Sequence, residues 1–196
     1  MAKFYAVKQG RKVGIFSTWD ECKAQVDGYS GAKFKSFPSR AEALSYLGAG
    51  DEPLKDNSSI PVWYVDGSYN SSTKEYAFGA VLLYGGKEET FSRRFESDSL
   101  ASMHNVAGEI MGASFAMEYS KEHGFSDIAI YYDYTGIENW ALGNWKANLD
   151  GTKSYQELYK QLSPVLKVHF CKVKGHSGDK YNDLADRLAK DALGIK

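Results

Sequence analysis

Two patterns of apolar and polar residues divide this chain into strands and helices. Apolar residues at every second position predict strands, whereas apolar residues three and four positions apart predict helices. The predicted strands span residues 3–7, 12–16, 32–37, 62–67, 76–84, 90–96, 128–133 and 167–173. The predicted helices span residues 18–25, 39–48, 105–122, 154–162 and 181–193, and one more begins at Thr135. This order predicts an α/β fold.

Residues 49–60 are polar, lack periodicity and include Pro53, so we expect a flexible linker between two domains. Residues 1–48 have the predicted order ββαβα, and residues 61–196 form the larger domain. Residues 1–50 hold 8 Lys/Arg and 4 Asp/Glu, whereas residues 51–196 hold 16 and 21, although the whole chain has a net charge of −1. This asymmetry favours a basic binding module attached to an acidic domain that binds cations.

The composition is typical of a soluble protein of one or two domains: the 196 residues are 43% hydrophobic and 25% charged. Cys22 and Cys171 lie far apart and outside any CxxC pair, which disfavours a disulfide framework and a zinc site. No stretch approaches the roughly 20 apolar residues that span a bilayer, and the N-terminal residues lack the apolar run of a signal peptide. We therefore expect a cytoplasmic protein with no membrane partner.

A carboxylate stands in the apolar strand at residues 62–67. Asp66 follows an aromatic and β-branched run and precedes Gly67, which predicts an acid at the end of the strand and at the start of a glycine turn. A buried carboxylate is costly unless a charge compensates it, so one interpretation of Asp66 is a metal ligand. The other is an Asp that only caps the turn.

Three more acids and a histidine stand at structured positions. Glu109 lies in the second turn of a predicted helix, where the helix dipole or simple solvation explains it equally well. Asp133 ends an apolar strand, and open α/β sheets place their sites at strand ends. Asp186 lies near the start of the last helix, where a buried carboxylate needs a cation. His176 lies in a glycine-flanked loop and is either functional or a solvated loop residue.

In the N-terminal module, Trp19 begins a helix and Phe34 lies in a strand between Lys33 and Lys35. Rings that stack on sugars or bases, beside ammonium groups that meet phosphates, are typical of a nucleic-acid surface. Alternation puts Phe34 on one face of its strand and both lysines on the other. The alternative is that Trp19 and Phe34 are core residues.

Residues 3–47 resemble the N-terminal hybrid-binding domain of eukaryotic-type ribonucleases H. The motifs that carry the resemblance are Phe4-Tyr5-Ala6-Val7, Gly10-Arg11-Lys12, Thr18-Trp19-Asp20-Glu21-Cys22 and Ala32-Lys33-Phe34-Lys35-Ser36-Phe37. The resemblance implies that Trp19 and Phe34 stack on the DNA strand and that Lys35 holds a phosphate. Ser36 departs from the family, which often has a second lysine there. A related module also occurs in some plant-virus translation regulators, so it does not by itself imply an enzyme.

Residues 61–196 resemble the catalytic domain of ribonuclease H of the HI type. The motifs are Tyr64-Val65-Asp66-Gly67-Ser68, Asn105-Val106-Ala107-Gly108-Glu109, Tyr132-Asp133, Lys174-Gly175-His176-Ser177-Gly178 and Asn182-Asp183-Leu184-Ala185-Asp186. The resemblance implies a mixed five-stranded sheet with helices on both faces. It also implies an endonuclease that cuts the RNA strand of RNA–DNA hybrids and leaves 5′-phosphate and 3′-hydroxyl ends.

The same resemblance assigns roles to the acids and the histidine. Two Mg²⁺ ions, for which Mn²⁺ can substitute, would be held by Asp66, Glu109, Asp133 and Asp186, with Asp66 bridging both ions. Hard carboxylate oxygens suit magnesium, and paired divalent ions suit phosphodiester hydrolysis. His176 is then expected to assist proton movement or product release.

The resemblance further implies that Asn105 contacts an RNA 2′-hydroxyl. Ser68 is expected near the nucleic acid, and Trp145 with Lys146 is the expected remainder of a basic protrusion found in some relatives. The chain departs from the family at Ser72 and His104, where relatives commonly have an Asn and a Thr that bind a DNA phosphate.

Two other functions compete with hybrid cleavage. One is an inactive hybrid-binding or regulatory protein, which the four intact acids disfavour. The other is an integrase-like strand transferase, which the N-terminal module and the His176 loop disfavour. No protein partner is implied, and we expect a monomer.

Overall fold

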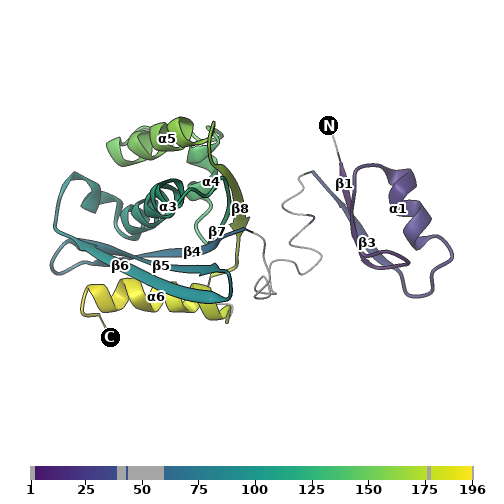
Figure 1. Ribbon diagram of the computed structural model, residues 1–196, viewed down its shortest axis with the longest axis horizontal. Helices are drawn as coiled ribbons and strands as arrows, with labels where there is room; N and C mark the ends of the chain where they lie inside the picture. The colour runs from purple at the N-terminus through teal and green to yellow at the C-terminus, as the bar shows by residue number, and fades with distance from the viewer. Residues whose placement is uncertain (1–2, 39–42, 44–59, 176–177, 196) are drawn as a thin grey trace. The chain divides into compact units, whose positions relative to one another are not determined.

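The computed structural model describes residues 3–38, 43, 60–175 and 178–195. The chain divides into two compact units, Met1–Pro53 and Leu54–Lys196 (Figure 1). Within the described residues, no helix combines the length and the apolar character needed to cross a membrane.

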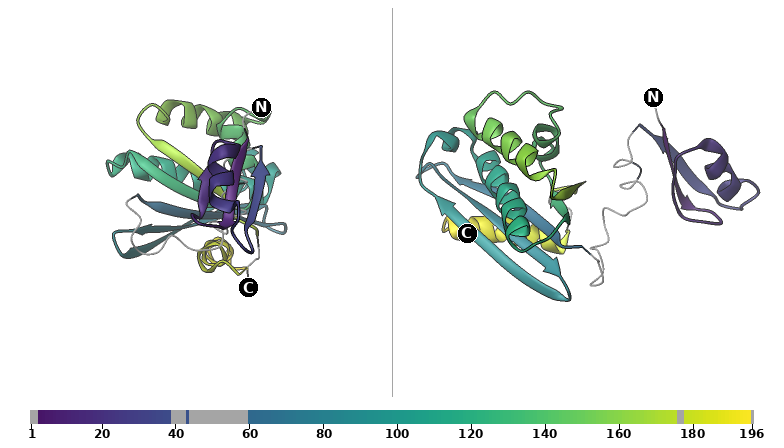
Figure 2. Two further views of the ribbon diagram at one scale, coloured as in Figure 1. Left: turned by 90° about the vertical axis from the view of Figure 1, so that its right-hand side faces the viewer. Right: turned by 45° about the horizontal axis from the view of Figure 1, so that its top comes forward.

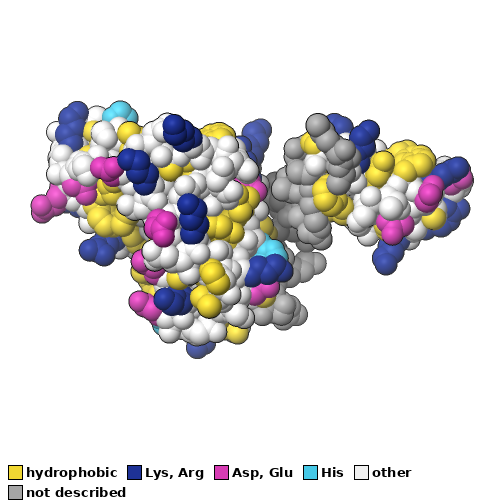
Figure 3. Space-filling model, turned by 90° about the horizontal axis from the view of Figure 1, so that it is seen from above, with side chains coloured by type: hydrophobic (Ala, Val, Ile, Leu, Met, Phe, Trp, Pro, Cys, Tyr) yellow, Lys and Arg dark blue, Asp and Glu magenta, His cyan; other side chains and the backbone are white. Residues whose placement is uncertain are grey.

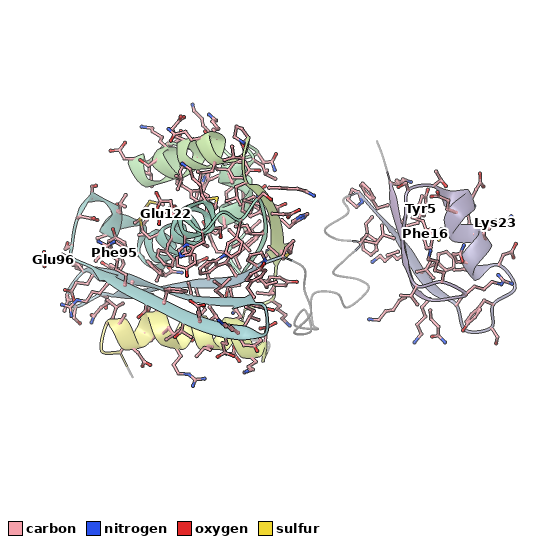
Figure 4. All side chains as sticks on the ribbon, in the orientation of Figure 1. Tyr5, Phe16, Lys23, Phe95, Glu96 and Glu122 are labelled. Atoms are coloured by element: carbon pink, nitrogen blue, oxygen red, sulfur yellow. The ribbon has the colours of Figure 1, made fainter. Side chains whose placement is uncertain are left out.

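The smaller unit is an antiparallel sheet packed against one helix. Its elements are β1 (Phe4–Gln9), β2 (Gly14–Phe16), α1 (Trp19–Val26) and β3 (Lys33–Phe37), with the strand order β2-β1-β3. Thr18 and Glu21 form a capping box at the start of α1, since Thr18 Oγ1 accepts a hydrogen bond from the Glu21 backbone N–H. Tyr5 and Phe16 pack with the buried side chains of α1 (Figure 4). The helix predicted at residues 39–48 lies outside the described part, apart from Ala43.

The larger unit is a mixed five-stranded sheet covered by helices on both faces. Its strands are β4 (Val62–Asn70), β5 (Glu75–Tyr84), β6 (Lys87–Phe95), β7 (Asp127–Tyr132) and β8 (Lys167–Lys172), in the order β6-β5-β4-β7-β8. Its helices are η1 (Ser99–Met103), α3 (Asn105–Glu122), α4 (Gly136–Ala141), α5 (Asp150–Leu162) and α6 (Lys180–Ala192). Helices α3, α4 and α5 cover one face and α6 the other (Figures 1 and 2). The predicted fold is confirmed.

The two faces of β4 pack into two separate cores. Trp63 and Val65 face α3 and pack with Met117, whereas Val62 and Tyr64 face the side of α6. This follows from the period of two along a strand. Asp66 therefore belongs to the same face of β4 as Val62 and Tyr64.

The prediction that β4 ends at Asp66 is wrong. The strand continues to Asn70, and Gly67 and Ser68 pair with Phe78 and Ala77 of β5 instead of forming a turn. The parallel partner β7 is shorter on this side, because its pairing with β4 covers only Val62 to Tyr64. Asp66 therefore lies beyond the end of the parallel pairing between β4 and β7. In this sense the prediction that Asp66 lies at a strand end is correct.

Of two further predicted helix starts, one is confirmed and one is wrong: Thr135 is the N-cap residue of α4, whereas Ser154 lies inside α5. Thr135 makes no side-chain cap of α4, because its hydroxyl contacts Lys172 Nζ while Glu138 accepts a hydrogen bond of 2.8 Å from the Tyr132 hydroxyl. Ser154 does not begin α5, which starts one turn earlier, at Asp150. The Thr135 hydroxyl is engaged by a residue far away in the sequence, and α5 begins with a local bond between Leu149 and Thr152. A polar side chain that could cap a helix can therefore be used elsewhere.

Candidate active site

Two glycines let helices approach β4 and β5 at the level of Asp66. A Cβ on Gly67 would lie 2.2 Å from the Asn105 carbonyl oxygen, and a Cβ on Gly79 would lie 2.0 Å from the Ala185 carbonyl oxygen. Because Gly79 is the cross-strand partner of Asp66, α3 and α6 both reach the sheet where this carboxylate stands. The glycine after Asp66 is thus explained by a close helix contact.

Gly79→Ala should lower the free energy of unfolding by about 2–4 kcal/mol, because the new methyl group meets rigid backbone atoms of α6. Denaturant unfolding measures the change. Gly112→Ala is the matched control, since its Cβ would meet only side-chain atoms at 3.2 Å or more. Equal stability of Gly79→Ala and the wild type would contradict the close approach of α6.

Three carboxylates from three elements converge beside Gly67. Asp66 of β4, Glu109 of α3 and Asp133, which follows β7, each offer an oxygen, and these oxygens all lie within 4.8 Å of one another. Asp66 is 8% exposed and Glu109 is 2% exposed. Glu109 is therefore more than a dipole-stabilising residue on a solvated helix, and Asp66 is more than a turn cap.

Burial and neighbouring charges disfavour the ionised forms of these acids. Burial, followed by the charge of Asp133, raises the pKa of Asp66 to about 7, although the Gly67 N–H donates a hydrogen bond of 2.7 Å to it. Burial, followed by the charges of Asp66 and Asp133, raises the pKa of Glu109 to about 9. The cluster therefore needs a cation if all three acids are to be ionised at neutral pH.

The donor set fits a hard divalent ion. Glu109 Oε2 is buried and has no hydrogen-bond partner among the described residues, so it is free to act as a ligand. The three groups supply only carboxylate oxygens, the ligands that magnesium and manganese prefer over nitrogen or sulfur.

Asp186 takes a different position from the other three acids. In the described part of the chain it is not a member of the close cluster, although its charge contributes to raising the pKa of Asp66. Its Oδ2 accepts a hydrogen bond of 2.7 Å from Lys190 Nζ, one helical turn further along α6. Lys190 is not among the residues predicted for the site, although oppositely charged side chains four positions apart commonly pair on a helix.

The predicted residues around the cluster differ in accessibility. Asn105 is exposed at the start of α3, and its Nδ2 lies 3.5 Å from Glu109 Oε1. Ser68 is 8% exposed, so its side chain offers little surface to a ligand. Asn70 Oδ1 is occupied by the backbone N–H groups of Ser72 and Thr73 in the turn after β4. His176 lies outside the described residues.

Trp145 and Lys146 lie on the surface after α4. The Trp145 ring is 41% exposed and makes an edge contact with Trp140 at 5.7 Å between ring centroids. Lysine and arginine side chains on the face shown in Figure 3 are interspersed with acidic and apolar ones. Trp145 and Lys146 are both exposed, so their side chains are accessible to a ligand.

In the smaller unit, three rings form a surface group. The Trp19 ring lies 5.7 Å from Tyr5 and 5.8 Å from Phe34, and Trp19 and Phe34 are 44% and 41% exposed. Such exposure is unusual for core residues. Lys35 lies on the other face of β3, where its Nζ is 5.6 Å from the Phe37 ring centroid. The structure therefore brings the two rings together and leaves Lys35 apart from them.

A mixed sheet with carboxylates converging beyond the end of its parallel strands is an arrangement suited to an enzyme that uses divalent metal ions. The family model described as RNase H matches residues 58–194, and the model described as Ribonuclease H1 N-terminal domain matches residues 3–47. The chain belongs to the RNase H family.

Of the named relatives, one spans almost the whole chain and the others span about two thirds of it. Ribonuclease H1 of Mus musculus is 24% identical over 97% of this chain and 89% of its own length. Ribonuclease H of Syntrophomonas wolfei is 32% identical over 66% of this chain and 93% of its own length. The crystal structure of RNase H1 from Halobacterium salinarum has the same fold, with a TM-score of 0.58 at 22% identity, covering 69% of this chain and 98% of that one.

Family membership makes this chain a nuclease with ribonuclease H activity on RNA–DNA hybrids. The family depends on divalent metal ions, and the acidic cluster supplies suitable ligands. Binding of RNA–DNA hybrids follows from the two domains together.

Proposed function

We propose that the chain is an endonuclease that hydrolyses the RNA strand of RNA–DNA hybrids with two Mg²⁺ ions and leaves 5′-phosphate and 3′-hydroxyl ends. Mn²⁺ can substitute for Mg²⁺. Residues 1–48 bind the hybrid, residues 49–60 link the domains, and residues 61–196 carry out the cleavage. The observation that carries this proposal is the convergence of Asp66, Glu109 and Asp133 within 4.8 Å.

The side chains at and around the cluster have different roles in this proposal. Asp66, Glu109, Asp133 and Asp186 would hold the ions, which when bound supply an activated water and neutralise charge on the phosphate. Asn105, exposed beside Glu109, would orient the RNA strand through a 2′-hydroxyl. His176 would assist proton movement or product release.

Substrate binding is shared between the two units. Trp19 and Phe34 would stack on the DNA strand, because both rings are exposed and adjacent. Lys35 would hold a phosphate from the other face of β3, and Trp145 with Lys146 would contact the hybrid near the cleavage site. Ser68 would act through its backbone, since its side chain is buried. A cytoplasmic monomer with no protein partner remains our prediction.

Asp133→Asn should reduce cleavage of an RNA–DNA hybrid by about 10³-fold or more, because it removes one ligand of a site whose metal chemistry supplies several kcal/mol of transition-state stabilisation. The assay compares the wild type and the variant with Mg²⁺ and with a chelator. Asp127→Asn, at the opposite end of β7, is the matched control and should retain activity.

Cleavage that survives either Asp133→Asn or chelation would exclude the two-metal assignment. No cleavage by the wild type would instead favour a hybrid-binding protein without nuclease activity.

A further inference from the structure

Lys190 is a cation placed beside the carboxylate cluster by the fold. Ala185 and Ala189 are fully buried where α6 meets β5, and Asp186 and Lys190 each follow one of these alanines. The two charged side chains therefore form a stripe along α6 next to its contact with Gly79, the strand partner of Asp66. The charges of Asp186 and Lys190 both act on Asp66, so both side chains lie near the cluster.

The ammonium group of Lys190 is bonded to the acid that stays apart from the cluster. Lys190 Nζ lies 2.7 Å from Asp186 Oδ2, and the side chains are 41% and 22% exposed. Lys190 also acts on Asp66 electrostatically, since its charge is among those that lower the pKa of that carboxyl against the larger effect of burial. It is thus close enough to act on both acids.

We propose that Lys190 is a built-in counter-cation that holds Asp186 outside the Asp66, Glu109 and Asp133 cluster until a divalent ion takes its place. Lys190 is a positioning residue: its bond to Asp186 competes with the ion for the fourth carboxylate. It thereby sets the ion concentration at which Asp186 joins the site. The inference rests on the proposed metal-dependent function.

The competition has two opposite consequences. Without divalent ions, Lys190 reduces the repulsion between Asp66 and Asp186, so it should stabilise the fold. With divalent ions, a neighbouring ammonium group repels the incoming cation and its bond to Asp186 must break, so it should weaken ion binding. A lysine that only packs on the surface would do neither.

Calorimetric titration of the full chain with Mg²⁺, in the absence of nucleic acid, tests the proposal. Lys190→Met should bind Mg²⁺ about 3- to 10-fold more tightly than the wild type, because a partly exposed charge pair is worth a modest free energy. Its melting temperature should be lower than that of the wild type in chelator and equal to it at saturating Mg²⁺. Lys190→Arg should behave as the wild type.

Two further variants isolate the bond to Asp186. Arg187→Met removes a positive charge from an exposed position of the same helix and should leave Mg²⁺ affinity unchanged. In an Asp186→Asn background, Lys190→Met should no longer tighten ion binding, because the competition for the carboxylate is gone.

Unchanged or weaker Mg²⁺ binding by Lys190→Met, with normal binding by the wild type, would overturn the role of Lys190 alone. Absence of any Mg²⁺ binding by the wild type would overturn the metal assignment itself, and with it this inference.

Discussion

Glu109→Gln should abolish hybrid cleavage and at the same time stabilise the metal-free protein at pH 8. The unfolded chain ionises Glu109 near the ordinary carboxyl pKa, but burial and the charges of Asp66 and Asp133 raise its pKa in the folded protein to about 9. At pH 8 the fold must therefore keep a proton that the unfolded chain has released, at a cost of about 2–5 kcal/mol. A neutral Gln avoids this cost.

The pH dependence has a defined sign. A carboxyl group whose pKa is raised on folding stabilises the fold at low pH, and this stabilisation is lost as the pH rises through the folded pKa. In chelator, the wild type should therefore become less stable from about pH 4.5 to about pH 9, the interval between the two pKa values of Glu109. The Asp66 pKa of about 7 adds to this loss in the lower part of the interval.

Thermal unfolding in chelator between pH 5 and pH 9 measures the effect. The melting temperature of Glu109→Gln at pH 8 should exceed that of the wild type by about 5–15 °C, and the two should converge toward pH 5. Glu118→Gln, at an exposed position of the same helix, should change neither stability nor cleavage. Mg²⁺ should stabilise the wild type more than Glu109→Gln.

Two results would contradict this account. A less stable Glu109→Gln protein at pH 8 would mean that the Glu109 carboxylate is compensated inside the fold. Retained cleavage would mean that Glu109 is not a ligand.

Trp19→Ala should weaken hybrid binding by about 1–3 kcal/mol, or roughly 5- to 150-fold in Kd, while cleavage at saturating enzyme stays nearly intact. The reason is that the exposed Trp19 ring can stack on the substrate, whereas the carboxylates belong to the other unit. Binding is measured with a labelled hybrid in chelator, so that no cleavage interferes.

Tyr29→Ala is the matched control for the stacking prediction. Tyr29 is an aromatic residue of the same unit with 39% exposure, and it is not part of the Tyr5, Trp19 and Phe34 ring group. Its substitution should leave binding unchanged. Unchanged binding by Trp19→Ala would refute a stacking role, and equal losses in both variants would indicate a general effect on the module.

Most helices and strands, and the protein family, could be predicted from the sequence. The helix predicted at residues 105–122 is confirmed as α3, and three of the four acids that the motifs singled out converge in the structure. Side-chain caps were predicted less well. The Thr135 hydroxyl contacts Lys172 and makes no cap of α4, and Ser154 lies inside α5, which begins at Asp150. Polar side chains with several available partners are resolved only by the packed structure.

The sequence by itself determined which residues alternate toward the cores and which acids stand at structured positions, because periodicity and local motifs are properties of neighbouring residues. Only the tertiary structure decided that Asp66 lies within a strand, that Gly67 and Gly79 admit two helices beside it, and that three acids converge while Asp186 pairs with Lys190. The physical reason is that burial, close backbone contact and charge–charge distance depend on residues far apart in the chain.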